Sequence, residues 1–126
     1  MITKELTYKI IGSAMEVHKT LGSGFLESVY QEALCIELDN NKIAFKKEVP
    51  LKIKYKNTAL SKEYYADIIC EDDIILELKA VSSITKEHIA QTLHYLKTTN
   101  KELGLILNFG ASSLEYKRII NTKKEA

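Results

Sequence analysis

Residues 64–80 read YYADIICEDDIILELKA, and this stretch decides how we expect the chain to fold. It contains two short, mostly apolar segments separated by the acidic sequence Glu71-Asp72-Asp73. Apolar segments of this length, bounded by turn-forming residues, are typical of strands that are buried on both faces. We therefore predict a β-hairpin with the acidic residues in its turn.

Three charged side chains interrupt the apolar segments: Asp67 in the first, and Glu77 and Lys79 in the second. Burying an unpaired charge is unfavourable, so these groups need partners or a metal ion. If the hairpin turns about Asp72, Asp67 lies opposite Glu77. Tyr65 then lies opposite Lys79. Opposed residues share one face of a sheet, and two facing carboxylates repel each other unless a cation lies between them. The hairpin therefore indicates a site for a divalent metal ion.

Two other interpretations of these residues remain open at this point. The three charges can form a structural salt-bridge cluster, in which Lys79 neutralises one acid at a sheet edge. A two-residue turn at Asp72-Asp73 would instead shift the register by one residue and place Asp67 and Glu77 on opposite faces. The hairpin alone does not separate these possibilities.

The composition indicates a folded protein with little net charge. The chain has 126 residues, 45% of them hydrophobic, and one proline, which suits a single domain over residues 1–126 with a core of its own. It has 18 Lys and Arg against 17 Asp and Glu, so its overall charge does not favour nucleic-acid binding. No apolar run approaches the roughly 18 residues of a membrane span, and the N-terminal sequence lacks the apolar segment of a signal peptide. We expect a cytoplasmic protein that does not enter membranes.

The two cysteines, Cys35 and Cys70, occur without a CxxC or a Cys/His metal spacing. This pattern fits a reducing compartment and small buried hydrophobic side chains, and it argues against cysteine-held zinc or iron–sulfur sites.

Two helices are predicted before the hairpin. Apolar residues at helical spacing indicate a helix over residues 4–21 that ends at Gly22. The apolar residues are Leu6, Ile10, Ile11, Ala14, Met15, Val17 and Leu21. His18 lies on the same side, where we favour a buried, hydrogen-bonded histidine over a metal ligand. A second helix is predicted from about Phe25 to Leu38.

Glu27 in the second predicted helix has two interpretations. With Gly24 as the N-cap, Glu27 falls at position N3, where a carboxylate interacts favourably with the helix dipole. Glu27 also aligns with Leu34 and Leu38 at the border of the apolar face. An acid at that border can face a cleft between helix and sheet, and we favour this second interpretation.

A strictly alternating pattern from Phe45 to Tyr55 predicts a strand with one exposed, basic face carrying Lys52, Lys54 and Lys56. Pro50 restricts this strand to a sheet edge or a bulge. Lysines commonly protect an exposed edge from pairing with other chains, and we favour this role over contacts with phosphate groups.

The chain after the hairpin predicts one more helix and two more strands. Thr85 is a suitable N-cap for a helix over residues 86–98, in which His88, Gln91 and Tyr95 share a face apart from the core residues. The apolar segment 103–109 predicts a strand, and alternation over residues 114–120 predicts a last strand at an edge. The tail from residue 121 is expected to be frayed. The fold class is therefore α/β with a mixed sheet, in the order ααβββαββ.

These residues together resemble a known nuclease motif. An acid is followed by E-x-K on the next strand and by Q-x-x-x-Y on a helix, here Asp67, Glu77-Leu78-Lys79, and Gln91 with Tyr95. This arrangement resembles the PD-(D/E)xK nuclease superfamily. Residues 24–30, GFLESVY, carry the pattern after which the GxxExxY family is named. The segments 10–34 and 103–110 are similar to that family too, so the resemblance covers nearly the whole chain.

The resemblance implies a restriction-endonuclease-like core, a central mixed sheet flanked by helices. It implies that Asp67 and Glu77, joined by the Leu78 carbonyl, hold Mg²⁺ or Mn²⁺ while Lys79 positions the attacking water. Glu27 matches a helix acid that supports the metal, and Gln91 and Tyr95 match a substrate-side helix. The chain departs from the superfamily pattern at position 66, which is Ala instead of Pro, and it lacks the four cysteines of iron–sulfur relatives.

The function implied is phosphodiester hydrolysis in nucleic acid, with DNA favoured as the substrate. The alternative is a non-catalytic nucleic-acid or protein interaction module that retains the nuclease fold. Near-neutral charge and the lack of an appended DNA-binding domain motivate this alternative. Because one small domain offers little surface for a substrate, we also expect a homodimer.

Overall fold

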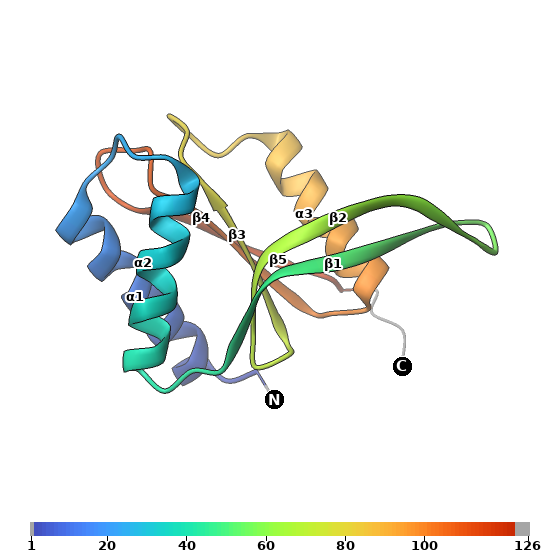
Figure 1. Ribbon diagram of the computed structural model, residues 1–126, viewed down its shortest axis with the longest axis horizontal. Helices are drawn as coiled ribbons and strands as arrows, with labels where there is room; N and C mark the ends of the chain where they lie inside the picture. Colours follow the sequence, from blue (N-terminus) through green and yellow to red (C-terminus); the bar gives the residue numbers. More distant parts are fainter. Residues whose placement is uncertain (1, 123–126) are drawn as a thin grey trace.

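The computed structural model describes residues 2–122 and has a central five-stranded sheet flanked by three helices (Figure 1). The predicted order ααβββαββ and the α/β class are confirmed. The elements are α1 (Lys4–Leu21), α2 (Glu27–Asn40), β1 (Phe45–Tyr55), β2 (Thr58–Cys70), β3 (Ile74–Lys79), α3 (Lys86–Thr99), β4 (Leu103–Asn108) and β5 (Glu115–Ile120).

The sheet is mixed, with the strands in the spatial order β1-β2-β3-β4-β5. All neighbouring pairs are antiparallel except β3 and β4, which run parallel because α3 crosses over between them. The predicted edge positions of β1 and β5 are confirmed. The central strand β3 is buried on both faces, as its apolar sequence indicates.

The register of the β2–β3 hairpin is symmetric about Asp72, as predicted. Ile68 pairs with Leu76, and Cys70 pairs with Ile74. The alternative two-residue turn is therefore wrong.

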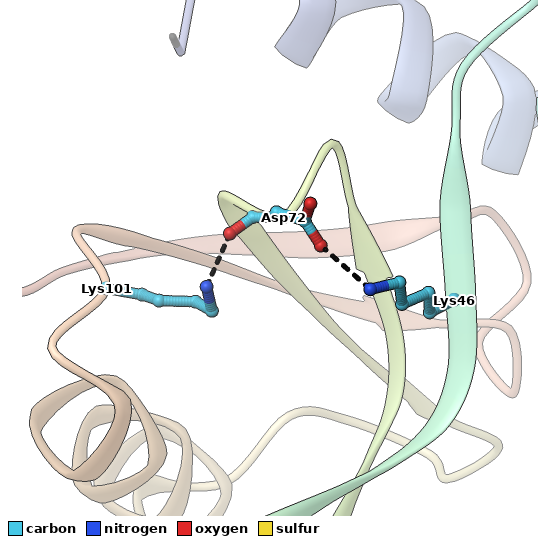
Figure 2. Close-up of polar contacts among 3 residues, drawn as sticks. All are labelled: Lys46, Asp72 and Lys101. Carbon is cyan, nitrogen blue, oxygen red and sulfur yellow. Dashed lines mark hydrogen bonds and ion pairs between the residues drawn. The ribbon is translucent and has the colours of Figure 1, made fainter.

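The turn of this hairpin is held by backbone and side-chain contacts. Glu71 and Asp72 adopt left-handed backbone angles, φ 53° and 57°, and the Asp73 N–H donates to the Cys70 carbonyl at 2.9 Å. Figure 2 shows that two lysines hold the turn. Lys46 lies 3.6 Å from an Asp72 carboxylate oxygen, and the Lys101 ammonium donates to the Asp72 carbonyl.

Two hydrophobic clusters pack on opposite faces of the sheet. One joins α1 and α2 to the sheet through residues such as Ile10, Tyr30 and Leu78. The other joins α3 to the sheet and includes Tyr95 and Ile75. Alternate residues of β3 belong to different clusters, which is the period of two expected for a strand.

Helix α1 has the predicted bounds and ends at Gly22, whose φ of 71° is unfavourable for residues with a side chain. His18 is buried, its Nε2 lies 2.9 Å from the Ala111 carbonyl oxygen, and its ring stacks on Phe109. The predicted structural role of His18 is confirmed. Met15 is 46% exposed, so its assignment to the apolar face was wrong.

The loop after β3 is held by the end of β4. The side-chain oxygen of Asn108 accepts hydrogen bonds from the Val81 and Gly110 N–H groups, both at 3.0 Å. A Cβ atom at Gly110 would lie 2.3 Å from the Val81 carbonyl oxygen, so only glycine fits there. This contact fixes the chain immediately after Lys79.

The strand β5 ends at Ile120, as expected, but the next residue is also held in place. Asn121 is buried, its N–H donates to the Glu102 carbonyl at 2.9 Å, and its side-chain amide donates to the Lys101 carbonyl. The expectation of a frayed tail is therefore wrong at Asn121, and residues 123–126 of that tail lie outside the described residues.

Both cysteines are free thiols; Cys70 is buried and Cys35 is half-buried. Burial raises the pKa of Cys70 to about 12, which fits the predicted role of a small hydrophobic residue. Within residues 2–122, none of the helices has the length and apolar character that crossing a membrane requires.

Candidate active site

The two acids predicted to face each other lie where β2 and β3 separate. The ladder between these strands runs from the Cys70–Ile74 pair to the Ile68–Leu76 pair. The next pair in the same register would be Asp67 and Glu77. At this pair, hydrogen bonds between side chains and backbone N–H groups replace the backbone ladder. The Asp67 N–H donates to Glu77 Oε2 at 3.1 Å, and the Leu78 N–H donates to Asp67 Oδ2 at 2.7 Å. Each carboxylate is thus oriented by the main chain of the opposite strand.

Burial makes this pair of acids electrostatically unfavourable. Glu77 is only 4% exposed, and burial, followed by repulsion from Asp67, raises its pKa to about 8. Burial also raises the pKa of Asp67, with the Leu78 N–H acting in the opposite direction. Hence Glu77 retains a proton at neutral pH unless a cation compensates its charge.

Lys79 lies two residues beyond Glu77 on β3 and is half-buried. Its positive charge lowers the pKa of both Asp67 and Glu77, although less than burial raises either. Within residues 2–122, Lys79 forms no ion pair with either acid, so the salt-bridge cluster considered from the sequence is not present. Negative charge in the site remains only partly compensated.

A cavity of about 130 Å³ opens beside Asp67, between the start of α2 and the sheet. Its lining residues are Glu27, Ser28, Gln31, Glu48, Asp67 and Leu78. The side-chain amide of Gln31 crosses from α2 to β2 and donates to the Asp67 carbonyl at 2.8 Å. Three carboxylates therefore line one small cavity.

Glu27 lies on this cavity but not at the helix position that we predicted. Leu26 is the N-cap of α2 and makes no side-chain cap, so Glu27 is residue N1 and the prediction of N3 behind Gly24 was wrong. An acid at N1 still interacts favourably with the helix dipole. Although its side chain is exposed, the charge of Glu27 raises the pKa of both Asp67 and Glu77.

Glu48 is a fourth acid of the site that the sequence analysis missed. It lies on β1 between residues paired with Ile68 and Ala66, and therefore opposite Asp67. Its φ of 52° is left-handed, which is unusual for a residue with a side chain. Glu48 Oε1 lies 3.4 Å from the Gln31 amide, and its charge raises the pKa of Asp67. One feature of the sequence could have singled out this residue: Glu48 is the only acid between Lys42 and Lys62.

The helix motif residues Gln91 and Tyr95 have different environments. Tyr95 is buried, and its ring centroid lies 5.6 Å from that of Tyr64 on β2. Burial raises the pKa of Tyr95 to about 12, and the charges of Glu77 and Asp67 contribute. Gln91 is exposed one turn earlier, and no hydrogen bond in the described chain joins it to the acids. Tyr95 thus lies near the acid pair, whereas Gln91 remains at the surface.

Comparison with known protein families gives one match for this chain. The model of the PD-(D/E)XK nuclease superfamily matches residues 4–119, nearly the whole described chain. The chain belongs to the PD-(D/E)XK nuclease superfamily. No curated protein and no solved structure matches it significantly.

Membership of the superfamily suggests a hydrolase that uses a divalent metal ion, and the donor set fits such an ion. Asp67 and Glu77 provide hard oxygen atoms, and their raised pKa values mean that a cation would relieve the repulsion between them. No group of three or more His, Cys, Asp or Glu residues that could hold a metal occurs within residues 2–122. Two carboxylates with water ligands suit a hard divalent cation better than an ion that requires a complete protein cage.

Proposed function

We propose that this chain is a metal-dependent nuclease of the GxxExxY branch that hydrolyses phosphodiester bonds, with DNA as the favoured substrate. The observation that carries this proposal is the acid pair Asp67–Glu77 at the point where two strands separate, in which Glu77 is buried, Asp67 is half-buried and backbone N–H groups orient both carboxylates. The turn and the backbone ladder over Ile68–Cys70 form without either acid, and the acids only accept one N–H group each beyond that ladder. Desolvated acids with raised pKa values beside a cavity are typical of a functional site.

Asp67, Glu77 and the Leu78 carbonyl would hold the Mg²⁺ or Mn²⁺ ion. When bound, such a cation lowers the pKa of the attacking water and stabilises the negative charge that develops on the phosphate. The hydrogen bonds from the Asp67 and Leu78 N–H groups keep the two carboxylates oriented, so little rearrangement is needed on binding.

The remaining residues act around this pair. Lys79, on the same strand as Glu77, would orient the attacking water and donate to the phosphate oxygens. Glu27 would act across the cavity through a water molecule, adding negative charge that strengthens cation binding. Tyr95 and Gln91 would contact the substrate on the α3 side, with Gln91 available because it is exposed.

The direct test is cleavage of single-stranded, duplex and branched DNA by the purified full chain with Mn²⁺. Asp67→Ala and Lys79→Ala are expected to abolish the cleavage seen with the wild type. Asp72→Asn is the matched control, since it removes an exposed carboxylate from the turn of the same hairpin and asparagine tolerates left-handed angles. The absence of metal-dependent cleavage of every substrate, or cleavage that survives Asp67→Ala, would contradict the proposal.

Metal binding separates the enzyme from a non-catalytic interaction module with the same fold. Titration calorimetry with Mn²⁺ should give binding in the wild type that is lost in Glu77→Ala. A wild-type chain that binds no Mn²⁺ would favour the interaction module.

We further propose that the chain acts in the cytoplasm as one domain and forms a homodimer. Its free cysteines fit a reducing compartment, and two copies would supply the surface that a nucleic-acid substrate covers. Light scattering measures the mass directly, and a monomeric mass would contradict the dimer.

A further inference from the structure

The outer parts of β1 and β2 form an arm, defined here as residues 52–62, that projects from the body of the molecule (Figure 1). Its two strands pair with each other as far as Tyr55 and Thr58, next to the turn. Within the described chain, β2 pairs with β3 only over Ile68–Cys70, so the arm is a two-stranded ribbon with two free edges.

The arm concentrates positive charge in a chain that is nearly neutral overall. It carries Lys52, Lys54, Lys56 and Lys62 and no acid. These are four of the 18 basic residues and none of the 17 acidic ones, so the rest of the chain has a net charge of −3. All four lysines are exposed. Lys52 lies 3.4 Å from Glu63, whereas no ion pair within residues 2–122 involves the other three.

Exposed aromatic side chains connect the arm with the acid pair. Tyr55 is 63% exposed, although the alternation of this strand places it on the face opposite the lysines, together with the buried Leu51. Lys56 lies over the Tyr55 ring, 5.5 Å from its centroid. Tyr64 and Tyr65 follow at the base of the arm and are also exposed, and the Tyr64 ring contacts Tyr95. Exposed lysines and tyrosines therefore occupy both faces of the ribbon, from its turn to its base near the acid pair.

Protection of a sheet edge explains lysines in general but not this distribution. Preventing edge pairing requires only a few charged side chains on a strand. It does not require any particular residue type at the other exposed positions. Here exposed tyrosines accompany the lysines, and the arm joins the sheet next to a site proposed to cleave phosphodiester bonds. A polyanion complements the positive arm, and a two-stranded ribbon has the width that the major groove of B-form DNA admits.

We propose that the arm binds the backbone of duplex DNA along the major groove. It would do so on one side of the phosphate that is cleaved at the acid pair Asp67–Glu77. This proposal rests on the proposed nuclease function and adds the substrate class to it. Lys62 and Asp67 are five residues apart on β2. At a rise of about 3.3 Å per residue this is about 16 Å, or roughly five base pairs of DNA. The contacts of the arm should therefore begin about five base pairs from the cleaved bond.

The test is fluorescence anisotropy with a labelled DNA duplex of about 25 base pairs in EDTA, measured over a range of salt concentrations. The arm variant is Lys54→Gln/Lys56→Gln/Lys62→Gln. The control is Lys4→Gln/Lys9→Gln/Lys19→Gln on α1, which removes the same charge from exposed positions at the opposite end of the molecule (Figure 1). Each lost phosphate contact reduces the slope of log K against log salt concentration by about 0.9. We expect a reduction of about 2 to 3 for the arm variant and below about 1 for the control.

The possible outcomes separate this proposal from the nuclease function. An arm-dependent slope in a chain that cleaves nothing would support the arm while the nuclease proposal fails. Cleavage by the wild type with an unchanged slope in the arm variant would overturn the arm alone. Equal losses in the two variants, or tighter binding of single strands than of duplex, would also overturn it.

An RNA duplex of the same sequence tests the assignment to DNA. It should bind without dependence on the arm, because its major groove is too narrow. Arm-dependent binding of that duplex would overturn the DNA assignment.

Discussion

The β2–β3 hairpin carries acids at both of its ends. The acids at the two ends differ in their exposure, their partners and their pKa values. At the turn, Asp72 is 80% exposed and lies 3.6 Å from the Lys46 ammonium. Glu71, beside it, accepts a hydrogen bond from the Ala44 N–H at 2.8 Å. At the diverging end, Glu77 is buried, faces a second carboxylate, and has its pKa raised to about 8.

This difference shows that the role of a carboxylate is set by burial and partners. The turn acids are solvated and partly neutralised by their partners. They therefore hold the turn at a small cost in free energy, and their charges do not require compensation by a metal ion. The acids at the diverging end are desolvated and repel each other, so a cation would gain free energy by binding between them. Both sets are equally acidic in the sequence, and only the second forms a candidate active site.

The largest expected effect is on cleavage. Asp67→Asn and Glu77→Gln each keep the shape of the side chain but remove a charge that would hold the cation. We expect each to reduce the rate of Mn²⁺-dependent DNA cleavage by at least about 10²–10³-fold, the size of losing one strong electrostatic contact. Asp72→Asn at the turn should change the rate by less than about twofold. Equal losses at the two ends would remove the distinction between them.

The next effect is on stability and depends on pH. In the unfolded chain Glu77 releases its proton near its ordinary pKa of 4.5, whereas in the folded chain it retains the proton up to pH about 8. Folding therefore takes up a proton between these pH values, and the stability of the metal-free protein falls as the pH rises through them. Glu77→Gln should remove this loss and stabilise the metal-free chain at pH 8.5, on the order of a few kcal/mol.

Urea unfolding in EDTA at pH 5, 7 and 8.5 measures this effect. The difference between Glu77→Gln and the wild type should grow with pH, while Asp72→Asn should show no such growth. A difference that is independent of pH, or a variant that is less stable than the wild type at pH 8.5, would show that the buried charge of Glu77 does not destabilise the fold.

Glu27 tests whether the acids around the cavity act together with the pair. If the carboxylate supports a cation through water, Glu27→Gln should weaken Mn²⁺ affinity by about 10–100-fold in calorimetry. Its cost to stability should stay below about 1 kcal/mol, because only one exposed charge at N1 is lost. Glu32→Gln is the matched control, since Glu32 is exposed on the same helix and does not line the cavity. Identical affinities for these two variants would mean that Glu27 only interacts with the helix dipole.

The smallest effect is expected at Glu48. Glu48→Gln removes a charge that raises the pKa of Asp67, but the residue is exposed and solvent screens its charge. Mn²⁺ affinity should therefore fall by less than about tenfold. The amide oxygen of the variant can still accept the hydrogen bond from Gln31, so the cavity should keep its shape. A larger loss than that of Glu27→Gln would assign Glu48 a direct part in the site.

Features that depend on local chemistry were predictable from the amino-acid sequence alone. Turn residues and the alternation of side chains set the register that places Asp67 opposite Glu77, because each pairing follows from the position of one turn. The end of α1 at Gly22 and the N-cap at Thr85 were also predictable, because a left-handed residue and a hydroxyl acceptor act within one helical turn.

Which residues from distant segments meet at the acid pair depends on how the helices and strands pack together. Glu48 lies opposite Asp67 because β1 pairs with β2 in one register and turns left-handed at that residue, which no periodicity indicates. Tyr95 is buried against Tyr64 although its sequence position suggested a polar face, because α3 packs across the base of the arm. Tyr55 and the lysines of the arm are exposed because no other element covers the two strands there. Spacing along the chain specifies the faces of each helix and strand, whereas the contacts between them depend on packing energies that involve the whole core.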